Sequence, residues 1–272
     1  MNRSTNRAMT WLNTVTAAAL MLLTALAYGE EPMTDARAIV EKAEQVAFYS
    51  GQDGRTEARM LITDRQNRRQ VRQFTLLRRT REDNSTQDMM VFFSRPADVR
   101  NTVFRVIKRV GTEDDRWLYL PGLDLVKRIS AGDKRTAFVG SHFFYEDVSG
   151  RSTQLDHYEL LETTEEVYRL KGTPKDPASV EFDHYIVAID RKTMLPVSTD
   201  YKNAQGKTYR QMEVLEIQTI EGYPTVTHSV MRDLETGGQT EMQFRNIAYD
   251  LGLPESVFSE RSLRNPPTEW LN

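Results

Sequence analysis

The chain is 272 residues long and near neutral, with 36 lysine and arginine residues against 39 aspartate and glutamate residues and a formal net charge of −3. This balance argues against nucleic acid as a partner, because nucleic-acid binding requires a stripe of basic side chains. The sequence contains no cysteine, which excludes disulfides, thiolate metal sites, thiol nucleophiles and lipidation at cysteine. A hydrophobic fraction of 39% is enough for one ordinary core.

Residues 1–27 have the pattern of a secretory signal peptide. Arg3 and Arg7 form a positive head, and the apolar run 17–27 ends in small side chains. We expect cleavage after Ala27 or after Gly29. The apolar run would span only about half of a bilayer as a helix, so a permanent anchor is the weaker alternative. The mature part, residues 28–272, is expected to be a single domain that is soluble and exported to the periplasm.

The first predicted element of the mature chain is an amphipathic helix over residues 35–48. Apolar side chains recur there every three or four positions, and Thr34 or Asp35 is placed to cap the N-terminus. The helix therefore has one apolar stripe and the character of a lid. The glycine-containing segment 49–54 ends it, and from there the hydrophobic period changes to two.

Segments rich in β-branched and aromatic residues then predict about eleven strands. These segments are 71–79, 89–94, 103–110, 116–120, 125–129, 157–162, 166–171, 180–190, 208–218, 225–234 and 239–249. Strands do not alternate with helices and no glycine-rich phosphate loop is present, so a doubly wound nucleotide-binding fold is disfavoured. We expect a mainly β member of the α+β class, with one antiparallel sheet that curls because its strands twist.

The concave face of such a sheet requires a cover. The helix over residues 35–48 is too small to cover it alone, so a second chain, a ligand or long loops must fill the remainder. Methionine and phenylalanine, which adapt to flexible apolar molecules, recur along the strands. Most of these side chains are expected in the core, but a soft cavity could hold acyl chains, because each buried methylene contributes about 0.8 kcal/mol.

Two catalytic interpretations centre on residues 141–147. Ser141 and His142 are adjacent and would point apart on a strand, and the G-x-S-x-G spacing is missing, which disfavours a serine hydrolase. His142, Glu146 and Asp147 resemble a set of metal ligands, although one histidine with two carboxylates is more typical of a solvated cap or an ion pair. We therefore expect no catalytic residue, no metal and no cofactor.

Two motifs carry a resemblance to a known family. Residues 117–121 read W-L-Y-L-P and residues 138–147 read F-V-G-S-H-F-F-Y-E-D, followed by Ile189-Asp190, Leu195-Pro196 and a closing Phe258-Ser259. With these motifs the mature chain resembles the outer-membrane lipoprotein-sorting proteins of the LolA-like superfamily, in the longer branch often encoded beside RND-type (MMPL-like) exporters. The resemblance implies an incomplete, strongly curved antiparallel barrel, with helices plugging its open side around an apolar cavity for acyl chains.

The resemblance also implies a function and partners. The expected protein is a periplasmic carrier and a monomer that accepts a lipid or lipoprotein acyl moiety from an inner-membrane RND/MMPL-type exporter and releases it toward the outer membrane. The candidate ligand-binding residues are Phe92, Phe104, Trp117, Tyr119, Phe143, Phe144, Tyr145 and Phe244. Gly140 and Asp147 have a structural interpretation, a tight backbone and the cap of a helical turn, with ligand contact as the alternative.

Two further hypotheses belong to other classes of protein. The first is a non-carrying accessory subunit of an RND-type transporter, docked through a sheet edge or through the lid helix. The second is a hydrolase, which would require Ser141 or His142 to be essential.

Overall fold

A computed structural model describes residues 31–82, 86–109 and 112–271. The predicted signal peptide, residues 1–27, and its two cleavage positions lie outside the described residues. The described residues from Met33 onward form one compact unit. In the described part of the chain, no helix is both long enough and apolar enough to cross a membrane.

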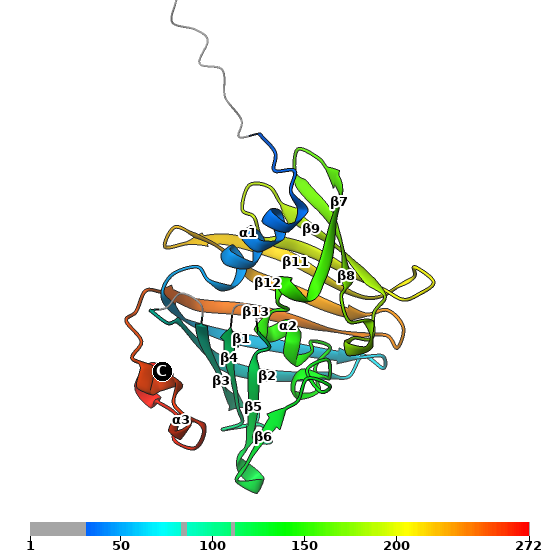
Figure 1. Cartoon of the computed structure of the whole chain (residues 1–272). Helices are drawn as coiled ribbons and strands as arrows, with labels where there is room; N and C mark the ends of the chain where they lie inside the picture. Colours follow the sequence, from blue (N-terminus) through cyan, green and yellow to red (C-terminus); the bar gives the residue numbers. More distant parts are fainter. Residues whose placement is uncertain (1–30, 83–85, 110–111, 272) are drawn as a thin grey trace, which may run out of the picture. The chain divides into compact units, whose positions relative to one another are not determined.

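The fold is dominated by one large antiparallel sheet (Figure 1). The helices are α1 (Ala36–Phe48), α2 (Tyr145–Ser149) and α3 (Arg261–Arg264). The strands are β1 (Asp53–Asp64), β2 (Arg69–Thr80), β3 (Thr86–Arg95), β4 (Val103–Arg109), β5 (Asp115–Leu120), β6 (Leu125–Ile129), β7 (Asp156–Thr163), β8 (Val167–Pro174), β9 (His184–Asp190), β10 (Pro196–Lys202), β11 (Thr208–Ile220), β12 (Tyr223–Asp233) and β13 (Gly238–Tyr249).

The strand order is β6-β5-β4-β3-β2-β1-β13-β12-β11-β10-β9-β8-β7, so the sheet consists of two meanders joined where β1 pairs with β13. Strands β6 and β7 end the sheet, which is not closed into a barrel. Figure 1 shows the sheet bent, with α1 and α2 on its inner side. The predicted fold class, a curved and incomplete barrel with helices on its open side, is confirmed.

Helix α1 forms where the sequence predicts it. Of the two candidate caps, Asp35 caps the helix: its carboxylate accepts hydrogen bonds from the backbone N–H groups of Arg37 and Ala38 at 2.8 and 3.0 Å. The apolar stripe is buried at Ile39, which packs with the inward side chains of β8 and β9. The stripe therefore fastens one end of the sheet to its lid.

Alternation along β3 builds two cores, one on each face of the sheet. Met89 and Val91 point into the concave side with α2, whereas Met90 and Phe92 point to the convex side. The convex side is covered by the C-terminal segment, in which Phe258 is 2% exposed. Figure 1 shows this segment, with α3, on the far side of β3 and β4 from α1.

The number of strands differs from the prediction. The described residues form thirteen strands rather than about eleven, because the predicted set omits β1 and β10. Strand β1 has few aromatic residues and many charged ones on its outward positions, and β10 begins with a proline. Both are identified by their pairing with two neighbours, which is a long-range property.

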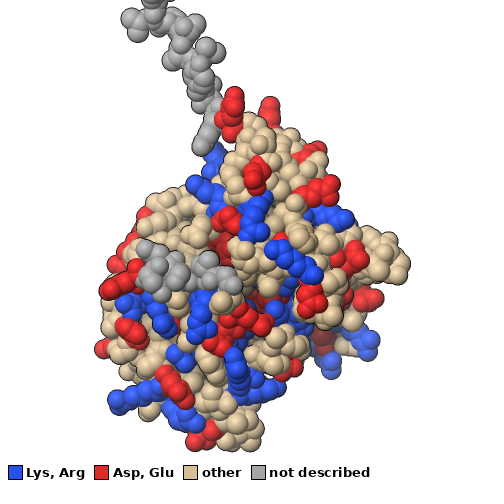
Figure 2. Space-filling model, in the orientation of Figure 1, with Lys and Arg blue, Asp and Glu red and all other residues tan. Residues whose placement is uncertain are grey.

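Acidic and basic side chains are interspersed on the face of the molecule in Figure 2. Several form ion pairs at the surface, such as Arg37 with Glu41 at 2.8 Å, where both side chains are more than 40% exposed. Such exposed pairs contribute little to stability, so they do not determine the fold.

Candidate functional site

A cavity of about 430 Å³ lies between α1, the α2 segment and the concave face of the sheet. Its volume is in the range of roughly 300–1,000 Å³ that is ordinary for ligand pockets. The walls are mostly apolar, and strands from both meanders contribute to them. The apolar side chains of this lining include Val40, Ala43, Val46, Phe48, Phe74, Leu76, Met89, Phe143, Val148, Val187, Ile189, Leu195, Met212, Val214, Val226, Met231, Met242, Phe244 and Ile247.

The lining follows from the two-residue period of the strands. On β2, Phe74 and Leu76 point into the cavity, whereas Leu77, the residue after Leu76, points into the convex core. On β13, Met242 and Phe244 do the same. Because the sheet bends, side chains from strands far apart in the order converge on one hollow.

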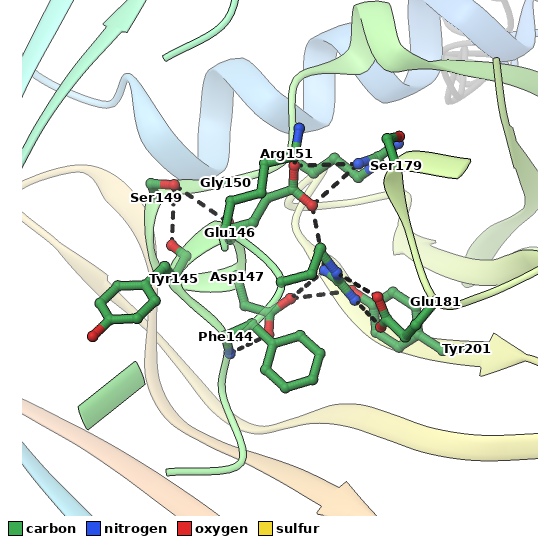
Figure 3. Close-up of polar contacts among 12 residues, drawn as sticks. Phe144, Tyr145, Glu146, Asp147, Ser149, Gly150, Arg151, Ser179, Glu181 and Tyr201 are labelled. Carbon is green, nitrogen blue, oxygen red and sulfur yellow. Dashed lines mark hydrogen bonds and ion pairs between the residues drawn. The ribbon is translucent and has the colours of Figure 1, made fainter. Parts of the chain in front are cut away.

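The segment before α2 adopts a tight backbone at Gly140, which has a φ of 77°. At the start of α2 the carboxylate of Asp147 accepts a hydrogen bond from the backbone N–H of Phe144 at 2.6 Å (Figure 3). The Arg210 guanidinium, from β11, donates to the carbonyl oxygen of His142 at 2.8 Å. The structural interpretation of Gly140 and Asp147, a tight backbone and a helix cap, is therefore confirmed.

Buried ion pairs attach α2 to the sheet. Asp147, which caps α2, pairs with Arg210 and, at 3.1 Å, with Arg135. Arg135 also pairs with Glu181 at 2.6 Å. Burial raises the pKa of Asp147, but the two guanidinium groups lower it by more, so its pKa lies below the ordinary value. These groups stay charged, and we assign them to structural support.

A second buried carboxylate lies one residue earlier. Glu146 is 1% exposed and pairs with Lys134, Arg135 and Arg151 at 3.3, 3.4 and 3.1 Å. Burial raises its pKa, but the three cations outweigh burial and the pKa of Glu146 is lowered. A carboxylate held ionised in this way is a poor general acid or base near neutral pH.

The residues of the catalytic interpretations have other partners. The Ser141 hydroxyl donates to the carbonyl oxygen of Phe143 at 3.2 Å, and Nδ1 of His142 lies 2.8 Å from the hydroxyl of Thr240. Burial lowers the pKa of His142. Among the described residues, no three histidine, aspartate or glutamate side chains are grouped as a metal site. The arrangement at residues 141–147 supports the loop conformation.

The eight predicted ligand-binding residues fall into four environments. Phe143 and Phe244 line the cavity. Phe104 and Tyr145 pack against each other in the concave core, with ring centroids 5.2 Å apart. Phe92 and Tyr119 belong to the convex core under the C-terminal segment.

The last two predicted residues stack on arginines. The ring of Phe144 lies under the Arg210 guanidinium, 3.9 Å from the centroid, and Trp117 lies under Arg105 at 5.0 Å. The structure therefore brings two of the eight residues together on the cavity wall. Aromatic content did not indicate the aliphatic and methionine side chains of β9 to β13 that also line the cavity. The sequence signal that could have identified them is the two-residue alternation of those strands.

The open antiparallel sheet with its plugged apolar hollow defines the LolA-like class of fold. A DUF1329 family protein from Desulfovibrio piger is 26% identical to the chain over 85% of it and 100% of its own chain, with a TM-score of 0.76. An outer membrane lipoprotein-sorting protein domain from Vibrio parahaemolyticus is 23% identical, covers 84% of this chain and 98% of its own, and has a TM-score of 0.76. A LolA superfamily protein from Nitrosomonas europaea is 18% identical, with coverage of 84% and 99% and a TM-score of 0.63.

The sequence also matches a family model, described as uncharacterized-protein-like, over residues 85–265. Because this match covers more than half of the chain, the chain belongs to that family, and its fold is that of LolA-like lipoprotein-sorting proteins. Among curated proteins, no sequence matches the chain. The likeness to LolA-like proteins that the two motifs predict is confirmed at the level of the fold.

Proposed function

We propose that the protein is a periplasmic carrier that binds a lipid or lipoprotein acyl moiety in its concave cavity, without catalysis. The observation that carries this proposal is the cavity itself, about 430 Å³ between the bent sheet and α1. Apolar walls of this kind bind hydrocarbon through burial of surface alone, at about 0.8 kcal/mol per methylene. The similarity to a lipoprotein-sorting domain supports the same function.

Loading of the carrier requires α1 to move away from the sheet. The backbone N–H of Met33, just before α1, donates to the Tyr168 hydroxyl at 2.9 Å, and the Gln87 amide donates to the carbonyl oxygen of Phe48 at 2.7 Å. Opening of the lid must also break the contacts of Glu44 with the Lys108 ammonium at 3.4 Å and with the Thr153 hydroxyl at 2.9 Å, whereas the continuously paired sheet behind it can stay intact. We further propose that an inner-membrane RND/MMPL-type exporter delivers the acyl moiety and that the outer membrane receives it.

The test is to fill the cavity. Val214 on β11 lines it, whereas Leu215, the next residue, is 45% exposed and does not belong to the lining. We expect Val214→Trp to abolish binding of a fluorescent acyl probe and Leu215→Trp to leave binding unchanged, with both variants folded by circular dichroism. Native mass spectrometry of the wild-type protein should show bound or transferable lipid.

Two results would contradict the carrier. One is a wild-type protein that binds no lipid by either method. The other is a Val214→Trp variant that binds as well as the Leu215→Trp variant does. Capture of an exporter by the protein that is independent of lipid and of both substitutions would instead support the non-carrying accessory subunit.

A further inference from the structure

We propose that the cavity selects amphiphiles with an anionic headgroup, a carboxylate or a phosphate, and that the Arg78 guanidinium binds this group. The inference rests on the proposed carrier function and deepens it by specifying the chemical class of the ligand. The inference is drawn from the charged side chains that line the cavity, because some of them already form ion pairs within the protein and one does not.

Strand alternation places Arg78 inside the cavity. Phe74, Leu76 and Arg78 occupy successive inward positions of β2, and all three line the cavity. Across the strands, Arg78 pairs in register with Gly54 of β1, and Gly54 pairs with Tyr249 of β13. Gly54 has no side chain, so Arg78 and Tyr249 meet across it, with the guanidinium carbon 5.4 Å from the ring centroid.

The guanidinium of Arg78 has unused capacity to donate hydrogen bonds. Its Nη2 donates to the carbonyl oxygen of Ser50, whereas its Nη1 is buried and has no hydrogen-bond partner in the structure. A buried donor without a partner costs free energy, and an oxyanion would supply the missing acceptor. Burial lowers the pKa of Arg78 and the Asp53 and Asp250 carboxylates oppose this shift, but an arginine remains protonated at neutral pH in either case.

The other charged side chains of the lining are already paired. Glu44 lies 3.4 Å from Lys108, Asp147 pairs with Arg210, and Arg151 lies 2.7 Å from Asp156. Among the charged side chains of the described lining, Arg78 is the one without an ion pair within 4.0 Å, although the Asp53 and Asp250 carboxylates interact with it from farther away. The cavity therefore offers its ligand one positive charge that has no direct ion-pair partner, with these two carboxylates farther away.

The polar groups near Arg78 give the cavity a polar end. The amide of Gln87, on an inward position of β3, and the hydroxyl pair of Thr225 and Tyr249, 2.7 Å apart, lie on the lining. The inward positions beyond them on β2 and β3, Leu76 and Met89, are apolar. An amphiphile would place its headgroup at the polar end and its chain along the apolar wall.

The experiment measures displacement of a fluorescent apolar probe from the full protein by palmitate, hexadecyl phosphate and hexadecanol, which share one hydrocarbon chain. We expect the wild-type protein to bind at least one of the two anionic ligands about tenfold more tightly than hexadecanol, because a charge-assisted hydrogen bond is added. Arg78→Met should lose this preference and keep its affinity for hexadecanol, while Arg78→Lys should keep part of it.

The matched control is Arg79→Met. Arg79 is the next residue of β2, on the convex face, where its guanidinium lies 4.0 Å from the Glu255 carboxylate. This variant removes the same charge at nearly the same place but outside the cavity, so it should keep the wild-type preference. Preference for palmitate alone or for hexadecyl phosphate alone supports the inference and identifies which oxyanion is bound.

Three outcomes overturn the inference. Equal affinity of the wild-type protein for charged and neutral ligands contradicts the inference but leaves the carrier function intact. An Arg78→Met variant that keeps the preference for anionic ligands has the same consequence. Inorganic phosphate that competes as well as hexadecyl phosphate would show a free-anion site instead. Failure of all three amphiphiles to bind contradicts the carrier function itself. The comparison of ligands on the wild-type protein is decisive even if a variant does not fold.

Discussion

The Asp147 carboxylate is buried, and a buried charge without a partner would cost free energy. The side chain is 8% exposed and is held by Arg210 and Arg135 and by the Phe144 backbone N–H. Removal of one member of a buried pair leaves the other members uncompensated, which costs about 3–5 kcal/mol. We therefore expect Asp147→Ala to lower the free energy of unfolding by about that amount, measured by urea denaturation.

The control for this prediction is an exposed ion pair. Arg37→Ala breaks the pair with Glu41 on the surface of α1, where the expected loss is below about 0.5 kcal/mol. An Asp147→Ala variant as stable as Arg37→Ala would show that the buried cluster does not hold α2 to the sheet.

Local chemistry made part of the site predictable at the residue scale. The left-handed backbone at Gly140 and the cap at Asp147 depend on neighbours within a few residues, so the sequence motif indicates both. Arg78 shows the limit: its alternation with Phe74 and Leu76 is visible in the sequence, but which face of the strand becomes concave depends on strands far along the chain.

Among the individual elements, α1 forms the lid, and its stability depends on its N-terminal cap. The Asp35 carboxylate accepts hydrogen bonds from two backbone N–H groups at the start of the helix, whereas Thr34, the other candidate cap, lies one residue before the N-cap position. We expect Asp35→Ala to destabilise α1 by about 1 kcal/mol and to speed hydrogen exchange of the α1 amides about fivefold, without change in the central strands.

Thr34→Ala is the matched control for the lid, because it truncates the neighbouring side chain without removing the cap. Equal exchange in the two variants would show that the cap does not limit opening of the helix. If exchange in the strands changed as much as in α1, the lid and the sheet would open as one unit.

The two strands that sequence patterns did not indicate differ in their signals. Strand β1 does alternate, with Ala58, Met60 and Ile62 buried and the intervening Arg59 and Leu61 less buried, so its period was available. Strand β10 has only one buried residue, Thr199, and its strand state comes from pairing with β9 and β11. The cover of the convex face by the C-terminal segment is likewise a long-range result, since its helical turns are too short to show a period.

The buried carboxylates set the acid stability of the whole molecule. Burial raises the pKa values of Glu146 and Asp147, but the arginines that face them outweigh burial, so both pKa values lie below the ordinary 4.5 and 3.8. A depressed folded-state pKa contributes stability that is present above the unfolded-state value and is lost as pH falls through the folded-state value.

We therefore expect these groups to leave the free energy of unfolding constant from about pH 7 to about pH 5.5 and to lower it progressively below about pH 4.5. Urea titrations at each pH measure this, and Asp147→Asn should reduce the slope at acidic pH because it removes one of the titrating groups. Stability that increased on acidification below pH 4.5 would contradict the assignment of these ion pairs.

Ligand binding and global stability are coupled in a carrier whose ligand occupies the space between its core elements. The cavity joins α1, α2 and strands of both meanders, and it exists only in the folded chain. A ligand that binds only the folded state stabilises it by about 2.7 kcal/mol at one hundred times its Kd. For a domain of this size that corresponds to a rise in Tm of about 5–10 °C.

We expect this rise for Leu215→Trp and the wild-type protein, measured by calorimetry with the tightest-binding amphiphile, and no rise for Val214→Trp. A wild-type Tm that did not change at saturating ligand would mean that the ligand has no preference for the folded chain, and the lid and sheet would then not enclose it.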